Sequence, residues 1–491
     1  MFKSERGQNI IVGQIIYRKF IPRISIFIFY WKEGGPDSSL PKVDETSKLR
    51  KIVIMVLYTP GSTTNYDSSP VEDGKLRYHF LGGGPEVGNV GCILEDSSGT
   101  RLQIDYGFVP KKPPTYPEEG PPVSDVILTH SHIDHVGLAP WIVASHGAKL
   151  HCTELTAAVL EMIWRDTYKV SSIEGQPLPW DKRDLEEALD QIVTHSFDEW
   201  VEHGEWKWRF LPAGHIPGAA MVEIQFGERN LLWSGDIDTR SSPCVIGAKP
   251  IKSDILFLES TYAGKNQPDR ESEVQRFINR VVEVVERGGT CLIPSFANGR
   301  GQDMLRYLWE SNLDLDVHYD GMGKRILNHY LSHPDYIRDV EVFRKIKRWA
   351  RLVSSKSDRK KAIDADVIVT TSGMLDGGPA HWYLNRLRHD QRNAVLLTGY
   401  QAEGSGGRQM LDSSRLKIFG KLVDINLEVD QFSFSNHADH SLLVDFAKDV
   451  GANDVVLFHG NRDDGQELLK NELENEETRI HQPDNCRSYL I

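Results

Sequence analysis

The sequence predicts an α/β protein in which one layered domain is interrupted by a second domain built on a parallel sheet. Residues 71–262 and the last part of the chain show short apolar strands separated by turns and flanked by helices, which is typical of layered α/β folds. Between them strands and helices alternate, which indicates a parallel, doubly wound sheet. We therefore expect an extension over residues 1–70, a first domain over 71–262 and 416–491, and an inserted domain over 263–415.

The first 70 residues differ from the rest in charge. They hold ten Lys and Arg against six Asp and Glu, whereas the whole chain of 491 residues has 57 against 70, a formal net charge of −13. Two apolar runs, around Ile21–Trp31 and Ile52–Tyr58, predict strands, and turn-rich linkers follow each. We interpret this segment as a packed or partly ordered extension. The alternative is an accessory contact or dimerisation arm.

Apolar runs bounded by turn residues predict the elements of the first domain. The expected strands are Leu76–Leu81, Gly91–Leu94, Arg101–Asp105, Val126–Thr129, Lys207–Leu211, Met221–Phe226, Asn230–Ser234 and Ile255–Leu258. Apolar residues at helical spacing predict helices over Leu138–His146 and Leu155–Tyr168. After residue 415 we expect strands Lys417–Phe419, Leu422–Asn426 and Glu428–Phe432, helix Ser441–Lys448 and strand Val455–Phe458.

In the inserted domain we expect helices and strands to alternate along the chain. Its predicted helices are Ser272–Glu286 and Gly301–Trp309, and its predicted strands are Thr290–Ile293, Leu315–Tyr319, Asp366–Thr370 and Val395–Thr398.

The composition excludes several classes of protein. With 40% hydrophobic and 26% charged residues, the chain is neither collagen-like, nor disordered, nor a disulfide scaffold. Five scattered cysteines without a CxxC pair fit a reducing compartment, so we expect a cytoplasmic protein. No apolar window reaches the roughly 18 residues of a membrane span, so no membrane association is expected. The acidic balance argues against coating nucleic acid by bulk charge, but it is compatible with a nuclease that has a local basic groove.

The sharpest chemical signal is THSHIDH over residues 129–135, directly after an apolar strand. It places His130, His132, Asp134 and His135 within six residues. These side chains cannot share one helix face, but they can converge where a strand ends in a tight turn that leads into a helix. Imidazoles and a carboxylate are ligands for Zn²⁺, and four of them exceed the need of one tetrahedral ion with an open position. The segment therefore predicts two metal ions; the alternative is a surface histidine turn.

Four further candidate ligands each follow a predicted strand. They are Asp105 after LQI, His215 after WRFL, Asp236 after NLLW and His459 after DVVL. Any one of them alone would be as well explained by a structural role. Because they share a position at strand ends, we predict that they join the THSHIDH segment, with the Asp236 carboxylate suited to bridging two ions.

This order of motifs resembles the metallo-β-lactamase superfamily. LESTYAG around Glu259, FSFSNHADH around His437 and FHGN around His459 are similar to motifs of its β-CASP nuclease branch. PSFANGRGQ, TSGML and GYQAEGSGGRQ resemble the inserted domain of that branch. The similarity covers roughly residues 76–491 and is closest to archaeal relatives of the nuclease subunit of the cleavage and polyadenylation specificity factor. It implies an αββα metallo-β-lactamase sandwich interrupted by an inserted parallel-sheet β-CASP domain.

The resemblance also implies a ligand set for two Zn²⁺ ions per chain. One ion would be held by His130, His132 and His215, the other by Asp134, His135 and His459, and Asp236 would bridge both. Asp105 would lie outside the ligands and fix their geometry.

Two further side chains are implied in catalysis, together with Asp236. His437 would protonate the leaving oxygen, since an alkoxide leaves poorly at neutral pH. Glu259 would hold that imidazole charged and oriented. The alternatives are a strand-end capping carboxylate for Glu259 and a structural histidine for His437.

Contacts to a phosphodiester chain are expected on turns of the inserted domain. The candidates are Ser295, Arg300, Ser372, Gly373, Tyr400 and Arg408. Ser372 and Gly373 are predicted to open a helix whose amides can cradle a phosphate, and glycine-rich turns allow close backbone approach. The alternative for all six is packing between the domains.

We therefore expect a zinc-dependent ribonuclease that hydrolyses phosphodiester bonds of single-stranded RNA, as an endonuclease, a 5′-to-3′ exonuclease or both. A DNA-processing enzyme of the same family is the first alternative, and His459 argues against it because DNA-directed members usually carry an apolar residue there. A small-molecule hydrolase would lack the insertion, and a metal-free scaffold would lack ligands. A homodimer through the C-terminal region is a further expectation.

Overall fold

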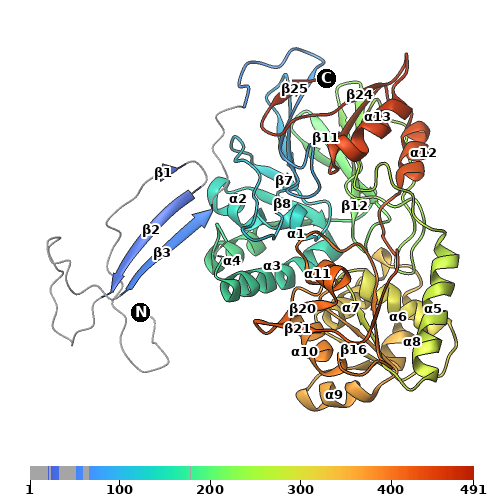
Figure 1. Cartoon of the computed structure of the whole chain (residues 1–491). Coiled ribbons are helices and arrows are strands. Elements are labelled where there is room, and N and C mark those ends of the chain that lie inside the picture. The colour runs from blue at the N-terminus through green and yellow to red at the C-terminus, as the bar shows by residue number, and fades with distance from the viewer. Residues whose placement is uncertain (1–19, 22–23, 32–50, 59–65, 177) are drawn as a thin grey trace.

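The computed structural model describes residues 20–21, 24–31, 51–58, 66–176 and 178–491 (Figure 1). It confirms the predicted fold class, since two seven-stranded sheets carry helices on their outer faces and a six-stranded parallel sheet forms the insertion. Among the described residues, no helix is long and apolar enough to cross a membrane.

The first sheet contains the early part of the chain and has the order β25-β4-β5-β6-β7-β8-β9. Its strands are β4 (Leu76–Gly82), β5 (Gly91–Asp96), β6 (Arg101–Ile104), β7 (Asp125–Ile127), β8 (Lys149–Thr153), β9 (Ile192–His195) and β25 (Ser488–Leu490). The helices that follow them are α1 (Ile133–Val136), α2 (Ala139–His146), α3 (Glu154–Glu174) and α4 (Lys182–Asp190). Val143, Leu160 and Leu185 pack these helices against the outer face of the sheet.

The second sheet has the order β10-β11-β12-β13-β14-β23-β24 and combines strands from both sides of the insertion. Its strands are β10 (Val201–His203), β11 (Trp206–Pro212), β12 (Ala220–Phe226), β13 (Arg229–Trp233), β14 (Ile255–Glu259), β23 (Asp454–Phe458) and β24 (Arg479–His481). Helices α12 (His440–Val450) and α13 (Glu467–Leu473) cover its outer face, and a short π-helix spans Arg462–Gln466.

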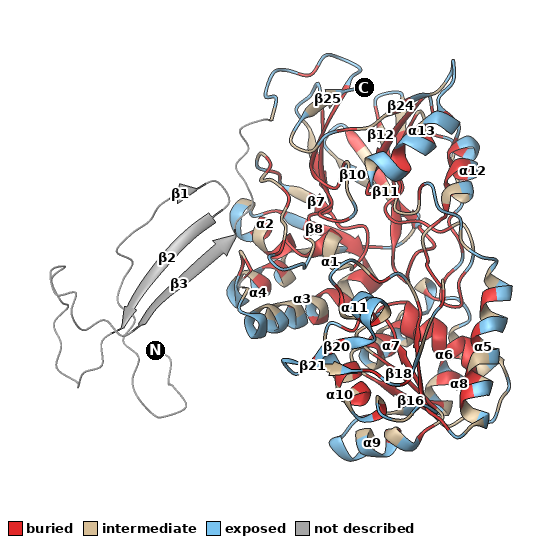
Figure 2. Ribbon diagram, in the orientation of Figure 1, coloured by how far each residue is buried: buried red, intermediate tan, exposed pale blue. Residues whose placement is uncertain are grey.

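Side-chain alternation in β14 explains how this sheet is covered on both faces. Ile255 and Phe257 face the core between the two sheets, whereas Leu256 and Leu258 face the outer helices. All five residues of β14 are buried, as expected for a central strand of a parallel region. In Figure 2 the central strands of the sheets are largely red, that is, buried.

The inserted domain has a sheet of order β17-β16-β18-β15-β19-β22, with every pair parallel. Its strands are β15 (Cys291–Pro294), β16 (Val317–Asp320), β17 (Arg351–Leu352), β18 (Val367–Thr370), β19 (Ala394–Leu397) and β22 (Glu428–Gln431). Its helices are α5 (Arg270–Glu286), α6 (Arg300–Glu310), α7 (Gly323–Ser332), α8 (Val340–Trp349), α9 (Lys356–Lys361), α10 (Gly378–Leu387) and α11 (Gly406–Ser413). Short 3-10 turns cover Pro334–Tyr336 and Ala362–Asp364, and β20 (Arg415–Ile418) and β21 (Lys421–Asp424) form a hairpin.

The pairing of β22 differs from the expected division at residue 415. This strand hydrogen-bonds to β19, and the following Phe432 and Phe434 pack against Phe277 of α5 in the core of the insertion. A four-residue, mostly polar strand carries no local sign of its partner, so the sequence pattern placed it in the first domain with the segments that follow it. We propose that the inserted domain continues to about residue 434.

The amino-terminal extension is described only in part. β1 (Phe20–Ile21), β2 (Ile24–Trp31) and β3 (Lys51–Tyr58) form an antiparallel sheet, which confirms the two predicted strands. The predicted role of residues 1–70 otherwise lies outside the described residues.

Candidate metal centre

The candidate ligands lie where strands end, as the sequence predicts. THSHIDH begins two residues after β7, and His132 is the N-cap of the single helical turn α1. Asp134 and His135 lie inside that turn. The strand, tight turn and helix expected from the spacing are therefore present.

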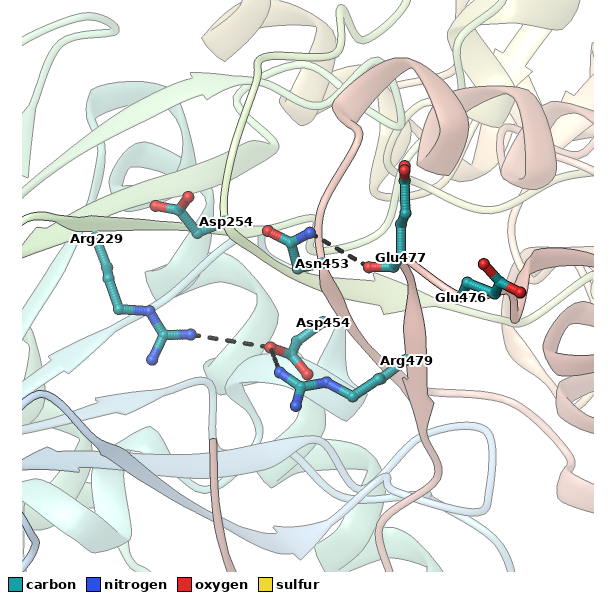
Figure 3. Close-up of a pocket in the computed structure, with 7 residues that line it drawn as sticks. All are labelled: Arg229, Asp254, Asn453, Asp454, Glu476, Glu477 and Arg479. Carbon is teal, nitrogen blue, oxygen red and sulfur yellow. Dashed lines mark hydrogen bonds and ion pairs between the residues drawn. The ribbon is translucent and has the colours of Figure 1, made fainter.

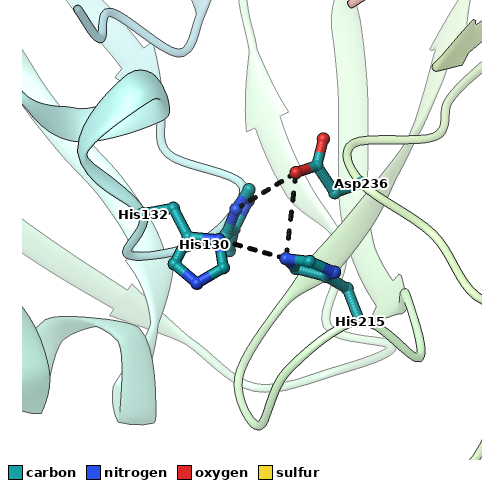
Figure 4. Close-up of side chains that lie close together, drawn as sticks. All are labelled: His130, His132, His215 and Asp236. Atoms are coloured by element: carbon teal, nitrogen blue, oxygen red, sulfur yellow. Dashed lines mark hydrogen bonds and ion pairs between the residues drawn. The ribbon is translucent and has the colours of Figure 1, made fainter. Parts of the chain in front are cut away.

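One group of side chains comes from three of these strand ends (Figure 4). It contains His130, His132, His215 and Asp236, whose ligand atoms all lie within 4.8 Å of one another. His215 Nε2 is 3.1 Å from His132 Nδ1, and Asp236 Oδ2 is 3.5 Å from His130 Nε2. Imidazole nitrogens and a carboxylate oxygen at this separation can surround one ion.

A second group adjoins the first through Asp236. It contains Asp134, His135 and His459, again within 4.8 Å. Asp236 Oδ2 lies 3.4 Å from His135 Nε2, and Asp236 Oδ1 lies 3.5 Å from His459 Nδ1. One carboxylate therefore reaches both groups, which is the arrangement expected of a bridging ligand.

Unpartnered atoms show that this cluster fits metal ions. His130 Nε2, His135 Nε2 and Asp236 Oδ1 are buried and have no hydrogen-bond partner. Leaving such groups unpaired is costly, and each is a lone-pair donor once the imidazole is neutral. Burial lowers the pKa of His130 and of His215, so both rings are held in the neutral form that coordinates a cation.

Outer partners aim these imidazoles at the centre. Asp105 Oδ2 is 2.8 Å from His135 Nδ1 and also accepts the Thr129 hydroxyl at 2.8 Å. The Asn436 carbonyl oxygen is 2.8 Å from His215 Nδ1. Each contact takes the nitrogen that points away from the cluster and leaves Nε2 facing it, as in known metal sites.

His459 depends on a residue that sequence reasoning missed. Thr261 Oγ1 is 2.8 Å from His459 Nδ1, and it lies two residues after Glu259. His459 itself has φ 51° and Asp105 has φ 57°, so both occupy the left-handed region where their strands turn away. Thr261 lies inside the LESTYAG motif, and this membership is the one sign of it in the sequence.

His437 and Glu259 form a third group with Asp236. His437 Nδ1 is 2.9 Å from Glu259 Oε1, and His437 Nε2 is 4.0 Å from Asp236 Oδ2. Burial opposes a positive charge on the imidazole. The Glu259 carboxylate, and to a smaller extent those of Asp236 and Asp134, outweigh it and raise the pKa of His437 to about 9. A protonated imidazole that points toward the cluster can donate a proton there.

The inserted domain holds the loop that carries His437. Arg270 donates to the Ser435 carbonyl at 2.7 Å, and Asp303 of α6 accepts from Asn436 Nδ2 at 3.0 Å. From the first domain, Arg240 also donates to the His437 carbonyl at 3.1 Å. These hydrogen bonds could not be predicted from the local sequence, because the residues that they join are distant along the chain.

Comparison with known proteins supports one family. A family model described as "Metallo-beta-lactamase superfamily" matches residues 117–253, "Beta-Casp domain" matches 303–410, and "Zn-dependent metallo-hydrolase RNA specificity domain" matches 422–481. "RNase aCSPSF2" of Saccharolobus solfataricus is 32% identical over 80% of this chain and 82% of that protein. The chain belongs to the β-CASP family of the metallo-β-lactamase superfamily.

Other β-CASP relatives extend the same pattern. "Probable RNase MJ4" of Methanocaldococcus jannaschii is 30% identical over 78% of this chain and 92% of that protein. "Cleavage and polyadenylation specificity factor 73" of Drosophila melanogaster is 29% identical over 81% of this chain and 61% of that protein. A solved structure, "Crystal Structure of a Protein of Unknown Function from Enterococcus faecalis V583", shares the fold with TM-score 0.56 and 12% identity, over 85% of this chain and all of that one. This β-CASP protein is accordingly a metallo-hydrolase with a His/Asp cluster able to bind metal.

The predicted substrate contacts Ser295, Arg300, Ser372, Gly373, Tyr400 and Arg408 all lie on segments that follow the carboxyl ends of β-CASP strands. Ser295, Ser372 and Tyr400 follow β15, β18 and β19, which are neighbours in that sheet. Arg300 opens α6 beneath this edge and donates to the Thr398 carbonyl. Arg408 lies on α11, which follows the loop of Tyr400, and its guanidinium forms an ion pair with Asp412 on the same helix.

A polar pocket lies at the opposite edge of the second sheet (Figure 3). It is lined by Arg229, Asp254, Asn453, Asp454, Glu476, Glu477 and Arg479. Arg229, Asp454 and Arg479 are the first residues of β13, β23 and β24, whereas the candidate ligands follow the last residues of parallel strands. Asp454 is paired with Arg479 at 2.6 Å, so we assign this pocket no part in the chemistry.

Proposed function

We propose that this protein is a ribonuclease that uses two Zn²⁺ ions to hydrolyse phosphodiester bonds of single-stranded RNA. The observation that carries the proposal is geometric. Seven candidate ligands form two adjoining groups, and His437, held by Glu259, faces the carboxylate that the groups share. The names of the relatives support RNA as the substrate, since two of them are called RNases. The match of residues 422–481 to an RNA specificity domain includes His459 and agrees with that choice.

The ligand roles follow from the two groups. His130, His132 and His215 would hold one ion, Asp134, His135 and His459 the other, and Asp236 would bridge them. When bound, the ions would neutralise the charge of the scissile phosphate and acidify a water molecule. Asp105 orients His135, and the Asn436 carbonyl orients His215, so the protein fixes the geometry before substrate arrives.

The proton for the leaving oxygen is assigned to His437. Its Nδ1 is held by Glu259, so its Nε2 is the atom that faces the cluster and can release a proton. Because Glu259 is fully buried, its negative charge acts on the imidazole with little screening by water. Glu259 would thus keep the ring both oriented and charged until the bond breaks.

Metal analysis combined with cleavage of matched RNA and DNA tests the proposal. We expect two zinc ions per chain, cleavage of 5′-labelled single-stranded RNA, no comparable cleavage of the same sequence as DNA, and loss of activity on chelation that Zn²⁺ restores. Fewer than one metal ion per chain would overturn the two-metal assignment. Equal cleavage of DNA would favour the DNA-processing alternative, and metal-bound protein without any nuclease activity would favour a scaffold.

Comparing 5′-labelled with internally labelled RNA separates the two modes of cleavage. An internal cut yields long labelled fragments from both substrates, whereas 5′-to-3′ removal releases mononucleotides. The homodimer through the C-terminal region stays a prediction, and light scattering of the purified chain measures it directly.

A further inference from the structure

Three loops form a rim along the inserted sheet next to the metal centre. They follow β18, β15 and β19, which lie side by side in that order. Ser295 Oγ and Thr398 Oγ1, on the last two of these loops, are 3.4 Å apart. Each of these two residues is followed within two positions by an exposed aromatic ring: Phe296 is 41% exposed and Tyr400 is 60% exposed.

The loop that carries Phe296 touches the ligand segment directly. Asn298 Nδ2 donates to Ser131 Oγ at 2.7 Å, and Ser131 lies between His130 and His132. Gly299 is packed so closely on Ile216 that an added Cβ would come within 2.8 Å of its side chain. The Phe296 ring therefore belongs to a loop that lies against two ligand-bearing segments.

The Phe296 ring lies beside Gly373 and is partly exposed. A Cβ added at Gly373 would come within 3.2 Å of Phe296 Cδ2, and 41% of Phe296 is open to solvent. Among the residues that the structure describes, no ring stacks on Phe296 or on Tyr400, although many aromatic rings of this protein pair inside its cores. Exposed aromatic rings in a nucleic-acid groove are the surfaces on which unpaired bases stack.

A positive charge lies beneath the same rim. Arg300 is 8% exposed, donates to the Thr398 carbonyl, and leaves its Nε without a hydrogen-bond partner. A guanidinium beside two exposed rings provides both attraction for a phosphate and faces for bases, the combination found in grooves for single-stranded nucleic acid. Bases of a duplex are already stacked on each other and cannot use such faces.

We propose that Phe296 and Tyr400 form a base-stacking subsite that receives unpaired bases of RNA next to the scissile phosphate. The inference rests on the proposed function and deepens it, because it explains why the substrate must be single-stranded. Phe296 would supply the ring nearer to the metal centre, and Tyr400 a second ring one loop away. Nucleotides that lie on these rings would hold the adjacent phosphate over the cluster.

Removal of single bases from the RNA tests this subsite. Wild-type protein and the variants Phe296→Leu and Tyr400→Leu would be assayed on a single-stranded RNA and on copies with one abasic nucleotide at each position near the cleavage site. For the wild type we expect the KM to rise about tenfold when the stacked base is missing. Phe296→Leu should raise the KM on intact RNA to a similar extent and lose sensitivity to that one abasic position, with Phe296→Tyr restoring both.

Phe419→Leu is the matched control. Phe419 is 65% exposed in the turn between β20 and β21 and is not part of the proposed subsite. It should leave the KM and the abasic profile as in wild type. The inference is overturned if Phe296→Leu and Tyr400→Leu keep the wild-type abasic profile, whatever their KM.

A binding measurement tests the stacking subsite even if the protein cleaves no RNA. Single-stranded RNA that carries 2-aminopurine at the stacked position would be titrated into chelator-treated protein, and its fluorescence is quenched by stacking on an aromatic ring. We expect quenching with wild type and Phe296→Tyr that is lost with Phe296→Leu. RNA that binds with equal quenching in all variants would refute the subsite, whereas quenching by a protein that cleaves no RNA would refute only the proposed function.

Discussion

His437 lies close to the shared carboxylate Asp236, and its partner Glu259 is fully buried. Removing the ring removes the proton donor and leaves all seven candidate ligands in place. The Asn436 carbonyl that orients His215 is main chain and is present whatever the next side chain is. The role of His437 is therefore separable from metal binding.

We predict that His437→Ala lowers kcat by about 10²–10⁴-fold, the usual contribution of a positioned acid, with the zinc content unchanged. Rates of RNA cleavage and metal analysis of the same preparation measure both quantities. Glu259→Gln is the companion variant, since it keeps an acceptor for Nδ1 and removes the charge. Wild-type turnover in His437→Ala would end the assignment.

A second buried histidine, His79, makes the stability of the fold depend on pH. His79 of β4 is 3% exposed, and its Nδ1 lies 2.9 Å from Ser488 Oγ of β25. Burial, aided by the nearby Arg77, lowers the pKa of His79 to about 4. The unfolded chain binds a proton at this residue with a pKa of about 6.5, so the folded state loses stability as the pH falls from about 6.5 to about 4.

We predict that His79→Gln flattens this pH dependence. The difference in free energy of unfolding between pH 7 and pH 4.5 should be smaller in the variant by no more than about 3 kcal/mol, since one pKa unit corresponds to about 1.4 kcal/mol. Urea unfolding of chelator-treated protein at several pH values measures it. Parallel pH profiles for the two proteins would contradict the assignment.

Among the elements, the single turn α1 carries two of the candidate ligands and is held by a neighbouring glycine. A Cβ at Gly107 would come within 1.8 Å of the Asp134 carbonyl carbon and 2.2 Å of the His135 nitrogen, both main-chain atoms. Tyr106 N donates to the His135 carbonyl at 2.7 Å from the same loop. The turn after β6 and the turn α1 are therefore in backbone contact, and only glycine permits it.

Gly107→Ala is predicted to displace α1 and weaken metal binding by at least about tenfold. Competition with a chromophoric chelator measures the affinity. Gly99→Ala is the control, because Gly99 has φ 79° with nothing within 4 Å of an added Cβ, so it strains a turn without touching the cluster. Wild-type zinc affinity in Gly107→Ala would show that α1 tolerates the shift.

At the scale of the whole molecule, buried polar contacts join the two domains around the cluster. Asp303 of the inserted domain accepts from Asn436 Nδ2 at 3.0 Å and from the Cys244 amide at 3.1 Å. Asn298 reaches Ser131 from the same domain. The ligand segments and the loop of His437 are thus positioned in part by a domain that supplies no candidate ligand.

Exchanging the two partners tests this coupling. Asp303→Asn places an amide where a carboxylate accepted two N–H groups, so one buried donor loses its partner at a cost of about 1–3 kcal/mol of stability. We predict a lower melting temperature and a lower kcat with zinc retained. Asp303→Asn combined with Asn436→Asp restores a donor opposite an acceptor, and both quantities should recover. Single and double variants that behave alike would exclude this contact as the link.

Much of the candidate site was predictable, because it is encoded locally. An apolar run followed by His or Asp shows both that a strand is buried and that a polar group stands at its end. This held for THSHIDH, His215, Asp236 and His459, all of which the structure brings together. Helix α3 shows the limit, since it continues past Tyr168 to Glu174, until Gly175 at φ 70° ends it.

The sequence by itself determined the order of elements, the fold class and the chemical types gathered at the strand ends. Only the tertiary structure decided which sheet receives β22, which residues aim the imidazoles and which rings remain exposed beside the cluster. The physical reason is the separation along the chain of the residues that interact. Periodicity and strand ends are set within about ten residues. Strand pairing and the Asp303–Asn436 contact join groups that are far apart in the chain, and the exposure of Phe296 depends on which distant segments pack beside it. Such contacts depend on the packing of whole domains, which no local pattern contains.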